Sequence, residues 1–510
     1  MGDFPEIQAL MRRILLSTVA ALLVCGPAWP AAEDLPDIGT PADTTLTQSD
    51  EYQIGLMVVK GLRDAGKILE DPESTEYLQS IGSRLASHAQ DGHQRFTFFV
   101  VKDPSINAFA LPGGFIGVNE GLILATANES ELAGVLAHEI AHVTQRHVAR
   151  SIQSAGRSSL VSAAAMLAAI LIGATTGMPA DVMTGAIAVA QGAAAQQRIN
   201  FTRSNEYEAD RIGIGTMAAS GFDPQAMPAF FDTMGRRAGL QGSQVPELLQ
   251  SHPVTTARIA ESRNRAHGYD IPLPPDSVSY GLSRERLRLL SLSSDTDARA
   301  YYTQYLATEK NHTDATRYGQ ALSLMQSGAP EEAIPILQGL SEKHTDVMQY
   351  RSALGEAQMA IGEKQESLST FARALELFPR NVPLTVRYAD ALMRANQPKL
   401  AHQILLDLFN TVYPTPEQCR LIAMAANSAG DVGDAYFYMS EYHVMSGDLM
   451  LALNQLQLAL AVPNLSEVQR ARFQARLDEL REYLPKGKAR VAAGPPDQRP
   501  EPEQRQPQPR

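Results

Sequence analysis

The sequence Ala137-His138-Glu139-Ile140-Ala141-His142 lies in a segment, beginning at Asn128, whose apolar residues repeat at helical spacing. Asn128, with a glutamate three positions on, is typical of a helix N-cap and capping box. Because residues four apart share one face of a helix, His138 and His142 can bind a single metal ion. Glu139 lies beside that face, where it can act as general base toward a water molecule at the metal. The alternative interpretation is a helix with two surface histidines.

A second acidic segment, Arg203-Ser204-Asn205-Glu206-Tyr207-Glu208-Ala209-Asp210, supplies what the first motif lacks. A catalytic zinc commonly takes three protein ligands, and a carboxylate from a second helix completes a His-His-Glu set. We predict Glu206 as this third ligand and Asp210, on the same helix face, as acceptor of the ring N–H of a ligand histidine. Glu208 points elsewhere and is interpreted as a solvated acid, and His147 as a structural hydrogen-bonding residue.

A third segment, Ser251-His252-Pro253, is followed by Arg258. A histidine on such a loop could approach the metal as a fourth ligand, or it could hydrogen-bond the oxyanion of a tetrahedral intermediate; it could also be incidental. Arg258 could brace the loop or stabilise the same negative charge. If His252 is a fourth ligand, the site is closed to water until the loop moves, and His252→Ala should raise peptidase activity.

The segment before the motif helix predicts three short strands, at residues 96–101, 106–111 and 115–118. A break at Pro112-Gly113-Gly114 separates the second strand from the third. A peptide hydrolase needs a sheet edge on which an extended substrate can be held. The predicted substrate-binding edge strand consists of Phe115, Ile116, Gly117 and Val118. A purely structural hairpin is the alternative.

Composition and charge limit the class of protein. The chain has 510 residues, enough for two or more domains, and 44% of them are hydrophobic, as in ordinary globular proteins. The net charge of −12 argues against a nucleic-acid partner, which would require a basic surface. The two cysteines are Cys25 and Cys419. Because Cys25 lies in a segment expected to be removed, we expect no internal disulfide in the mature chain.

Three other segments carry targeting and surface signals. Arg12-Arg13 and the apolar run after it predict a signal peptide over residues 1–32, and hence a periplasmic protein. Each half of the Ala-rich residues 159–195 is shorter than a membrane-spanning helix, so we expect a helical hairpin rather than the alternative of a membrane span. Contact with a membrane surface or a partner lies between these two. The Pro-, Gln- and Arg-rich residues 485–510 predict a disordered tail.

The second half of the chain repeats with a period of 34 residues. The repeated turn positions are Gly328, Gly362, Asn396 and Gly430, and the small residues five positions after them are Ala333, Ser367, Ala401 and Ala435. This is the tetratricopeptide period, in which stacked helix pairs form a concave surface for a peptide or protein. We therefore predict a peptidase domain at 33–270, a linker with a connecting helix at 271–310 and a repeat domain at 311–484.

These segments together resemble one family. The four segments Asn107-Ala108-Phe109-Ala110-Leu111-Pro112-Gly113-Gly114, the His138 motif, the Glu206 segment and the His252 loop follow the order found in zinc metallopeptidases related to HtpX and the CAAX prenyl proteases. The resemblance implies an α+β zincin-like domain, mostly helical with a small sheet, followed by an all-α tetratricopeptide solenoid. It implies one zinc ion held by His138, His142 and Glu206, with Glu139 as base and Asp210 as support, and His252 near the metal.

Two functions follow from the resemblance to the exported branch of that family. The first is a periplasmic endopeptidase that degrades misassembled outer-membrane proteins, while its repeats bind clients or the assembly machinery. The second is a chaperone-like assembly factor whose repeats carry the main role and whose protease site is latent.

Overall fold

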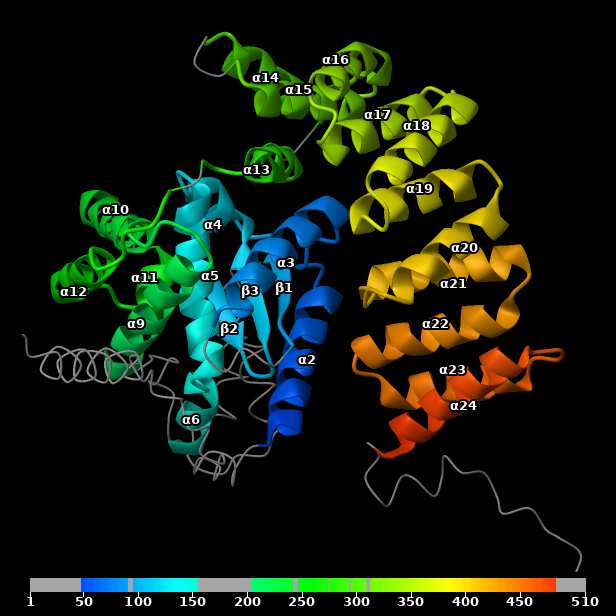
Figure 1. Ribbon diagram of the computed structural model, residues 1–510, viewed down its shortest axis with the longest axis horizontal. Coiled ribbons are helices and arrows are strands. Elements are labelled where there is room, and N and C mark those ends of the chain that lie inside the picture. Colours follow the sequence, from blue (N-terminus) through cyan, green and yellow to red (C-terminus); the bar gives the residue numbers. More distant parts are fainter. Residues whose placement is uncertain are drawn as a thin grey trace, which may run out of the picture. The chain divides into compact units, whose positions relative to one another are not determined.

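The computed structural model describes residues 47–89, 95–154, 203–241, 246–273, 275–292, 295–308 and 312–482. The predicted signal peptide, the segment 159–195 and the tail 485–510 lie outside these ranges, so those three expectations stay predictions. The described residues from Gln48 onward form one compact unit (Figure 1).

The first part of this unit consists of a small sheet and the helices packed around it. The helices are α2 (Gln48–Asp64), α3 (Pro72–Ala86), α4 (Glu120–Ala125), α5 (Glu129–Thr144), α6 (His147–Ser154), α9 (Arg203–Ala219), α10 (Ala226–Gln241), α11 (Glu247–Ser251) and α12 (Thr256–Ala266). The predicted N-cap is confirmed, because Asn128 accepts a hydrogen bond from the amide of Glu131 at the start of α5. The Glu131 side chain accepts from the amide of Ala127 and not from that of Asn128, which a capping box would require. At the start of α3, Asp71 accepts a hydrogen bond from the amide of Ser74.

The sheet has three strands, β1 (Thr97–Val101), β2 (Ala108–Leu111) and β3 (Phe115–Asn119), in the order β1-β3-β2. Strand β3 pairs with β1 in parallel and with β2 in antiparallel fashion. The prediction that residues 115–118 form a substrate-binding edge strand is therefore wrong, because β3 has a neighbour on both sides. Its residues are all buried, as expected for a central strand. The hairpin alternative is the one that the structure supports.

The motif helix α5 lies in the middle of the main hydrophobic core. Its apolar residues pack with α3, the sheet and α10 into one cluster, to which Leu136 and Ile140 contribute fully buried side chains. A helix that is covered on every side needs no polar face. The histidines and the glutamate of the motif are consequently buried polar groups within this core.

Two helices lie within the predicted linker 271–310, namely α13 (Val278–Leu290) and α14 (Asp295–Leu306). Helix α13 contributes Tyr280 and Leu287 to the core around α5, and Leu282 and Leu289 to the neighbouring core of the following helices. It thus joins two cores. The domain boundaries stay a prediction.

The remaining described helices follow one another as antiparallel pairs, coloured green to red in Figure 1. They are α15 (Asp314–Gln326), α16 (Pro330–Lys343), α17 (Met348–Ala360), α18 (Lys364–Leu377), α19 (Val382–Arg394), α20 (Pro398–Phe409), α21 (Pro416–Ala429), α22 (Val432–Met445), α23 (Leu449–Ala461) and α24 (Glu467–Glu482). The described helices include none that combines the length and the hydropathy needed to cross a bilayer.

The 34-residue period has a clear structural cause. Each of the four repeated turn positions has a positive φ, between 59° at Asn396 and 90° at Gly430, a conformation that glycine and asparagine adopt most readily. The four small residues five positions later are all buried. The mostly helical fold with a small sheet and a C-terminal helical repeat is thereby confirmed.

Candidate metal centre

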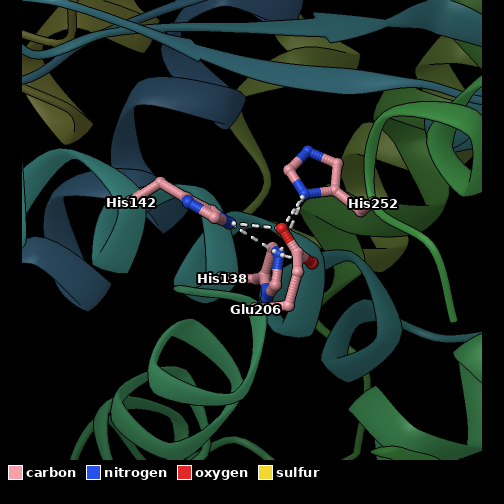
Figure 2. A group of neighbouring side chains, drawn as sticks. All are labelled: His138, His142, Glu206 and His252. Carbon is pink, nitrogen blue, oxygen red and sulfur yellow. Dashed lines mark hydrogen bonds and ion pairs between the residues drawn. The ribbon is translucent and has the colours of Figure 1, made fainter. Parts of the chain in front are cut away.

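Four side chains from three parts of the chain meet at one buried point. His138 and His142 come from α5, Glu206 from α9, and His252 from the residue that ends α11. Their ligand atoms all lie within 4.8 Å of one another, and Figure 2 shows the three rings and the carboxylate turned toward a common centre. Each residue is at most 2% exposed.

Individual distances define the cluster. The Nε2 atoms of His138 and His142 are 3.0 Å apart. Nδ1 of His252 is 3.0 Å from Oε1 of Glu206 and 3.4 Å from Nε2 of His138. Both Nε2 atoms of the motif histidines lie 3.5 Å from oxygens of Glu206. The residues that the sequence analysis selected as ligands are thus brought together, and His252 is among them.

The packing of α9 against α5 allows this approach. A Cβ atom on Gly213 of α9 would lie 3.2 Å from backbone atoms of Ala137 and His138. Because glycine has no Cβ, α9 can lie close enough to place Glu206 beside the two histidines. The same helix carries Asp210 one turn later, and that residue reaches the other side of His138.

Asp210 and Arg258 form a second layer around the ligand atoms. Oδ1 of Asp210 lies 2.9 Å from Nδ1 of His138, the contact that the sequence predicted. Arg258 donates hydrogen bonds to both oxygens of Asp210, at 2.6 and 2.9 Å, and lies 2.7 Å from Glu206. It also donates one to the carbonyl of Pro253, which favours the loop-supporting role of the two considered for Arg258.

The pKa values of the side chains in the cluster are set by burial, which disfavours the charged form of each group, and by the charges of its neighbours. Burial lowers the pKa of His142 well below its usual value, so its ring is neutral and has a lone pair to offer a metal. For His138, burial is outweighed by hydrogen bonds to Asp210 and Glu206, which raise its pKa to about 9. Burial would raise the pKa of Glu206, but His252 and His138 hold it well below the usual range. A metal cation would take over the positive charge that this carboxylate requires.

Glu139 lies in the same interior and is fully buried. Its carboxylate makes no side-chain hydrogen bond among the described residues, and the backbone of Ala110 is the one hydrogen-bonding group there that acts on it. Nε2 of His252 lies 3.5 Å from Oε1 of Glu139. Burial raises the pKa of Glu139, against the charges of His252 and His138. A fully buried carboxylate with so few partners is costly, so its presence indicates a role toward a group that binds here.

The prediction of His147 as a structural hydrogen-bonding residue is confirmed, but the sequence did not indicate its partners. His147 Nδ1 lies 2.7 Å from Nδ1 of His142, and its Nε2 lies 3.1 Å from Glu208. Glu208 is therefore connected to the site, and its interpretation as a solvated acid is wrong. Helix α5 ends at Thr144, and Arg146 has a positive φ of 52°. This turn brings His147 back toward His142, and no residue type in the sequence signals it.

The donor set fits a divalent transition metal. Three imidazoles and a carboxylate are the ligand types that zinc and its neighbours take in proteins. The cluster is buried, its neutral histidine has a lone pair available, and its carboxylate is charged. The residues present therefore fit a metal ion. Asp210 and Arg258, which are not needed as ligands, are placed to hold the ligand side chains in position.

Comparisons with known proteins agree with this geometry. The model of peptidase family M48 matches residues 72–266. The Beta-barrel assembly-enhancing protease of Escherichia coli K12 is 33% identical over 484 residues, which cover 92% of this chain and 97% of that protein. The Putative beta-barrel assembly-enhancing protease of Vibrio cholerae is 33% identical and covers 91% of this chain and 96% of its own length.

Among solved structures, a tetratricopeptide protein from Thermus thermophilus matches 39% of this chain and 93% of its own, at 19% identity and a TM-score of 0.24. The relation to the full-length proteases is what decides the family. This chain belongs to the metallopeptidases of peptidase family M48, in the branch of the beta-barrel assembly-enhancing proteases.

Proposed function

We propose that this protein is a zinc-dependent endopeptidase of the periplasm that degrades misassembled outer-membrane proteins, and that its repeat helices bind clients or the assembly machinery. The observation that carries the catalytic part is the buried group of His138, His142 and Glu206 beside the fully buried carboxylate of Glu139. The biological part is supported by the names of the full-length relatives, and the location by Arg12-Arg13 and the apolar run after it.

His138, His142 and Glu206 would hold the zinc ion, and when bound it would supply Lewis-acid polarisation of the scissile carbonyl. Asp210 fixes the ring of His138 by accepting its Nδ1–H, which leaves Nε2 as the ligand atom. Glu139 accepts a proton from the attacking water and delivers it to the leaving amine. Its buried position keeps that proton from exchanging with bulk solvent.

We propose strand β2, in place of β3, as the strand that binds the substrate. It is an edge of the sheet, because its one partner among the described strands is β3, and it packs against α5. An extended peptide that adds to its free edge would form backbone hydrogen bonds and would run past the motif helix. The residues of β2 are Ala108, Phe109, Ala110 and Leu111.

His252 lies among the donors, which favours the role of fourth ligand. A fourth protein ligand fills the position that a substrate carbonyl requires, so His252 would keep the site latent. We expect His252→Ala to degrade an unfolded substrate faster than the wild type. Unchanged or lower activity would favour the oxyanion role or an incidental one.

The proposed base is tested with Glu139→Gln. This variant should lose about 10²–10⁴-fold in the rate of casein degradation, because a positioned base contributes about that much. Its zinc content and circular-dichroism spectrum should stay unchanged, since glutamine has the same shape. Degradation at the wild-type rate would rule out Glu139 as the base.

The same variant separates the second function from the first. The repeat helices occupy most of the chain after residue 312, so a role independent of proteolysis has a structural basis. If Glu139→Gln restores outer-membrane protein assembly in cells that lack the wild-type protein, the repeat domain carries the main role.

A further inference from the structure

His147 lies between a metal-binding histidine and a carboxylate. Its ring is completely buried, with Nδ1 2.7 Å from Nδ1 of His142 and Nε2 3.1 Å from Oε2 of Glu208. The ring of His142 thus presents Nε2 to the metal centre and Nδ1 to His147. His147 is not one of the residues that converge on the metal centre.

One arrangement of protons satisfies every contact in this row. If Nε2 of His142 keeps its lone pair for the metal, its proton is on Nδ1, and Nδ1–H can donate to Nδ1 of His147. Nδ1 of His147 must then be unprotonated, which places the proton of that neutral ring on Nε2. Nε2–H in turn donates to the carboxylate of Glu208. The reverse arrangement would put a proton on the nitrogen that faces the metal.

The two histidines of the motif are therefore supported in parallel. His138 reaches Asp210 directly, and His142 reaches Glu208 through His147. Both carboxylates come from α9, the helix that also carries Glu206. A metal-binding histidine usually donates its other N–H to a carboxylate or carbonyl, and here an inserted imidazole carries that link from the interior to a partly exposed acid.

We propose that His147 and Glu208 are positioning residues that fix the tautomer and ring orientation of His142 for metal binding. The proposal rests on the proposed function in one respect, since it takes His142 as a metal ligand. Glu208 is suited to a clean test because its side chain is 32% exposed, so its removal should not disturb folding.

The test is the zinc affinity of the full chain, measured with zinc alone in competition against a chromophoric chelator. His147→Leu removes the acceptor and should weaken zinc binding about 10–100-fold. His147→Asn keeps an amide oxygen that can accept from His142 and should recover part of that loss. Glu208→Ala should weaken binding by about tenfold, at the lower end of that range, because water can replace part of the exposed contact.

Arg150→Ala is the matched control. Arg150 lies 3.3 Å from the same oxygen of Glu208, but its side chain is 45% exposed and it pairs with the acid rather than with the imidazole. Zinc affinity of this variant should stay within about twofold of the wild type, because an exposed pair of this kind contributes little. If Arg150→Ala lost as much zinc affinity as Glu208→Ala, the cause would be a general effect of charge. That result would overturn the proposed relay, in which His147 links His142 to Glu208.

The remaining outcomes separate the two proposals. If Glu208→Ala and a folded His147→Leu bind zinc as tightly as the wild type while His142→Ala does not, the relay is wrong and the metal site stands. If His142→Ala itself keeps wild-type affinity, the proposed metal site is wrong and the relay fails with it. If His147→Leu does not fold, the zinc affinities of Glu208→Ala and His147→Asn decide whether the proposed relay is correct.

Discussion

At the scale of single residues, Arg258 is a buried positive charge beside the metal-binding group. It is 2% exposed, and its guanidinium faces the buried carboxylates of Glu206 and Asp210. The pKa of Arg258 would be lowered by burial but is raised by these two carboxylates, so the three groups keep one another charged. Removing the arginine would leave two buried negative charges without their shared partner.

We therefore expect Arg258→Met to destabilise the zinc-free protein by about 3–5 kcal/mol, seen as a lower urea midpoint by circular dichroism. Arg263→Met on the same helix is the control. Arg263 pairs with Asp232 at 2.7 Å, but its side chain is 48% exposed, so we expect its midpoint to change little. Equal midpoints for the two variants would contradict the assigned role of Arg258.

The sequence located the ligand atoms better than the groups that support them. His138, His142, Glu206 and Asp210 could be predicted because helical geometry fixes which residues share a face. His147 reaches His142 through a turn at Arg146, a residue that gives no sign of a left-handed conformation. The hydrogen-bonding role of His147 was predicted, but its link from His142 to Glu208 depends on that turn and was found only in the folded chain.

At the scale of elements, the close contact of α9 with α5 sets the metal geometry. A side chain on Gly213 would meet the backbone of Ala137 and His138, which cannot rotate away. Gly213→Ala should push α9 outward by a few tenths of an ångström and carry Glu206 with it. We expect weaker zinc affinity and a lower melting temperature.

Gly215→Ala is the matched control on α9. Among the described residues, the one atom that lies within 4 Å of such a Cβ atom is the hydroxyl oxygen of Tyr269, at 3.4 Å. Alanine is about 1 kcal/mol more favourable than glycine inside a helix, so this variant should be as stable as the wild type or more stable. If both variants keep wild-type zinc affinity, close packing at Gly213 does not position Glu206.

Element order was harder to predict than element type. The three strands were recognised from their residues, but the sequence does not state which strand lies between the others. Strand β1 pairs with β3, although β2 lies between them along the chain. The repeat helices were easier, because each turn requires a residue that tolerates positive φ and the period repeats that requirement.

At the scale of the whole molecule, a buried group of charges connects α3 with the later helices. Asp71 accepts hydrogen bonds from Arg286 of α13 at 2.7 to 2.9 Å and from Arg387 of α19 at 3.1 Å. Arg387 also bonds Glu73, at 2.8 and 3.1 Å. These contacts join residues more than 200 positions apart, so the start of α3 is held by one helix within the predicted linker and by another in the repeat region after it.

The last prediction follows from Asp71. Burial alone would raise its pKa, but Arg286 and Arg387 outweigh burial and hold the pKa far below the usual value. A carboxylate with a lowered pKa contributes stability above its unfolded pKa of about 3.9 and loses it as the pH falls toward the folded value. Asp71→Asn keeps the helix cap and removes the charge. We expect it to lower stability by about 3–5 kcal/mol at pH 7.

The gap in urea midpoint between wild type and Asp71→Asn should narrow as the pH falls below about 5, because the wild-type aspartate then begins to lose its advantage. Asp64→Asn is the control: Asp64 pairs with Lys60 on the surface, with side chains 63% and 39% exposed, and should show little change at any pH. A gap that stays constant from pH 7 to about 3.5 would mean that Asp71 does not act through its charge. A gap that closes would show that this charge, shared by α3, α13 and α19, stabilises the whole unit.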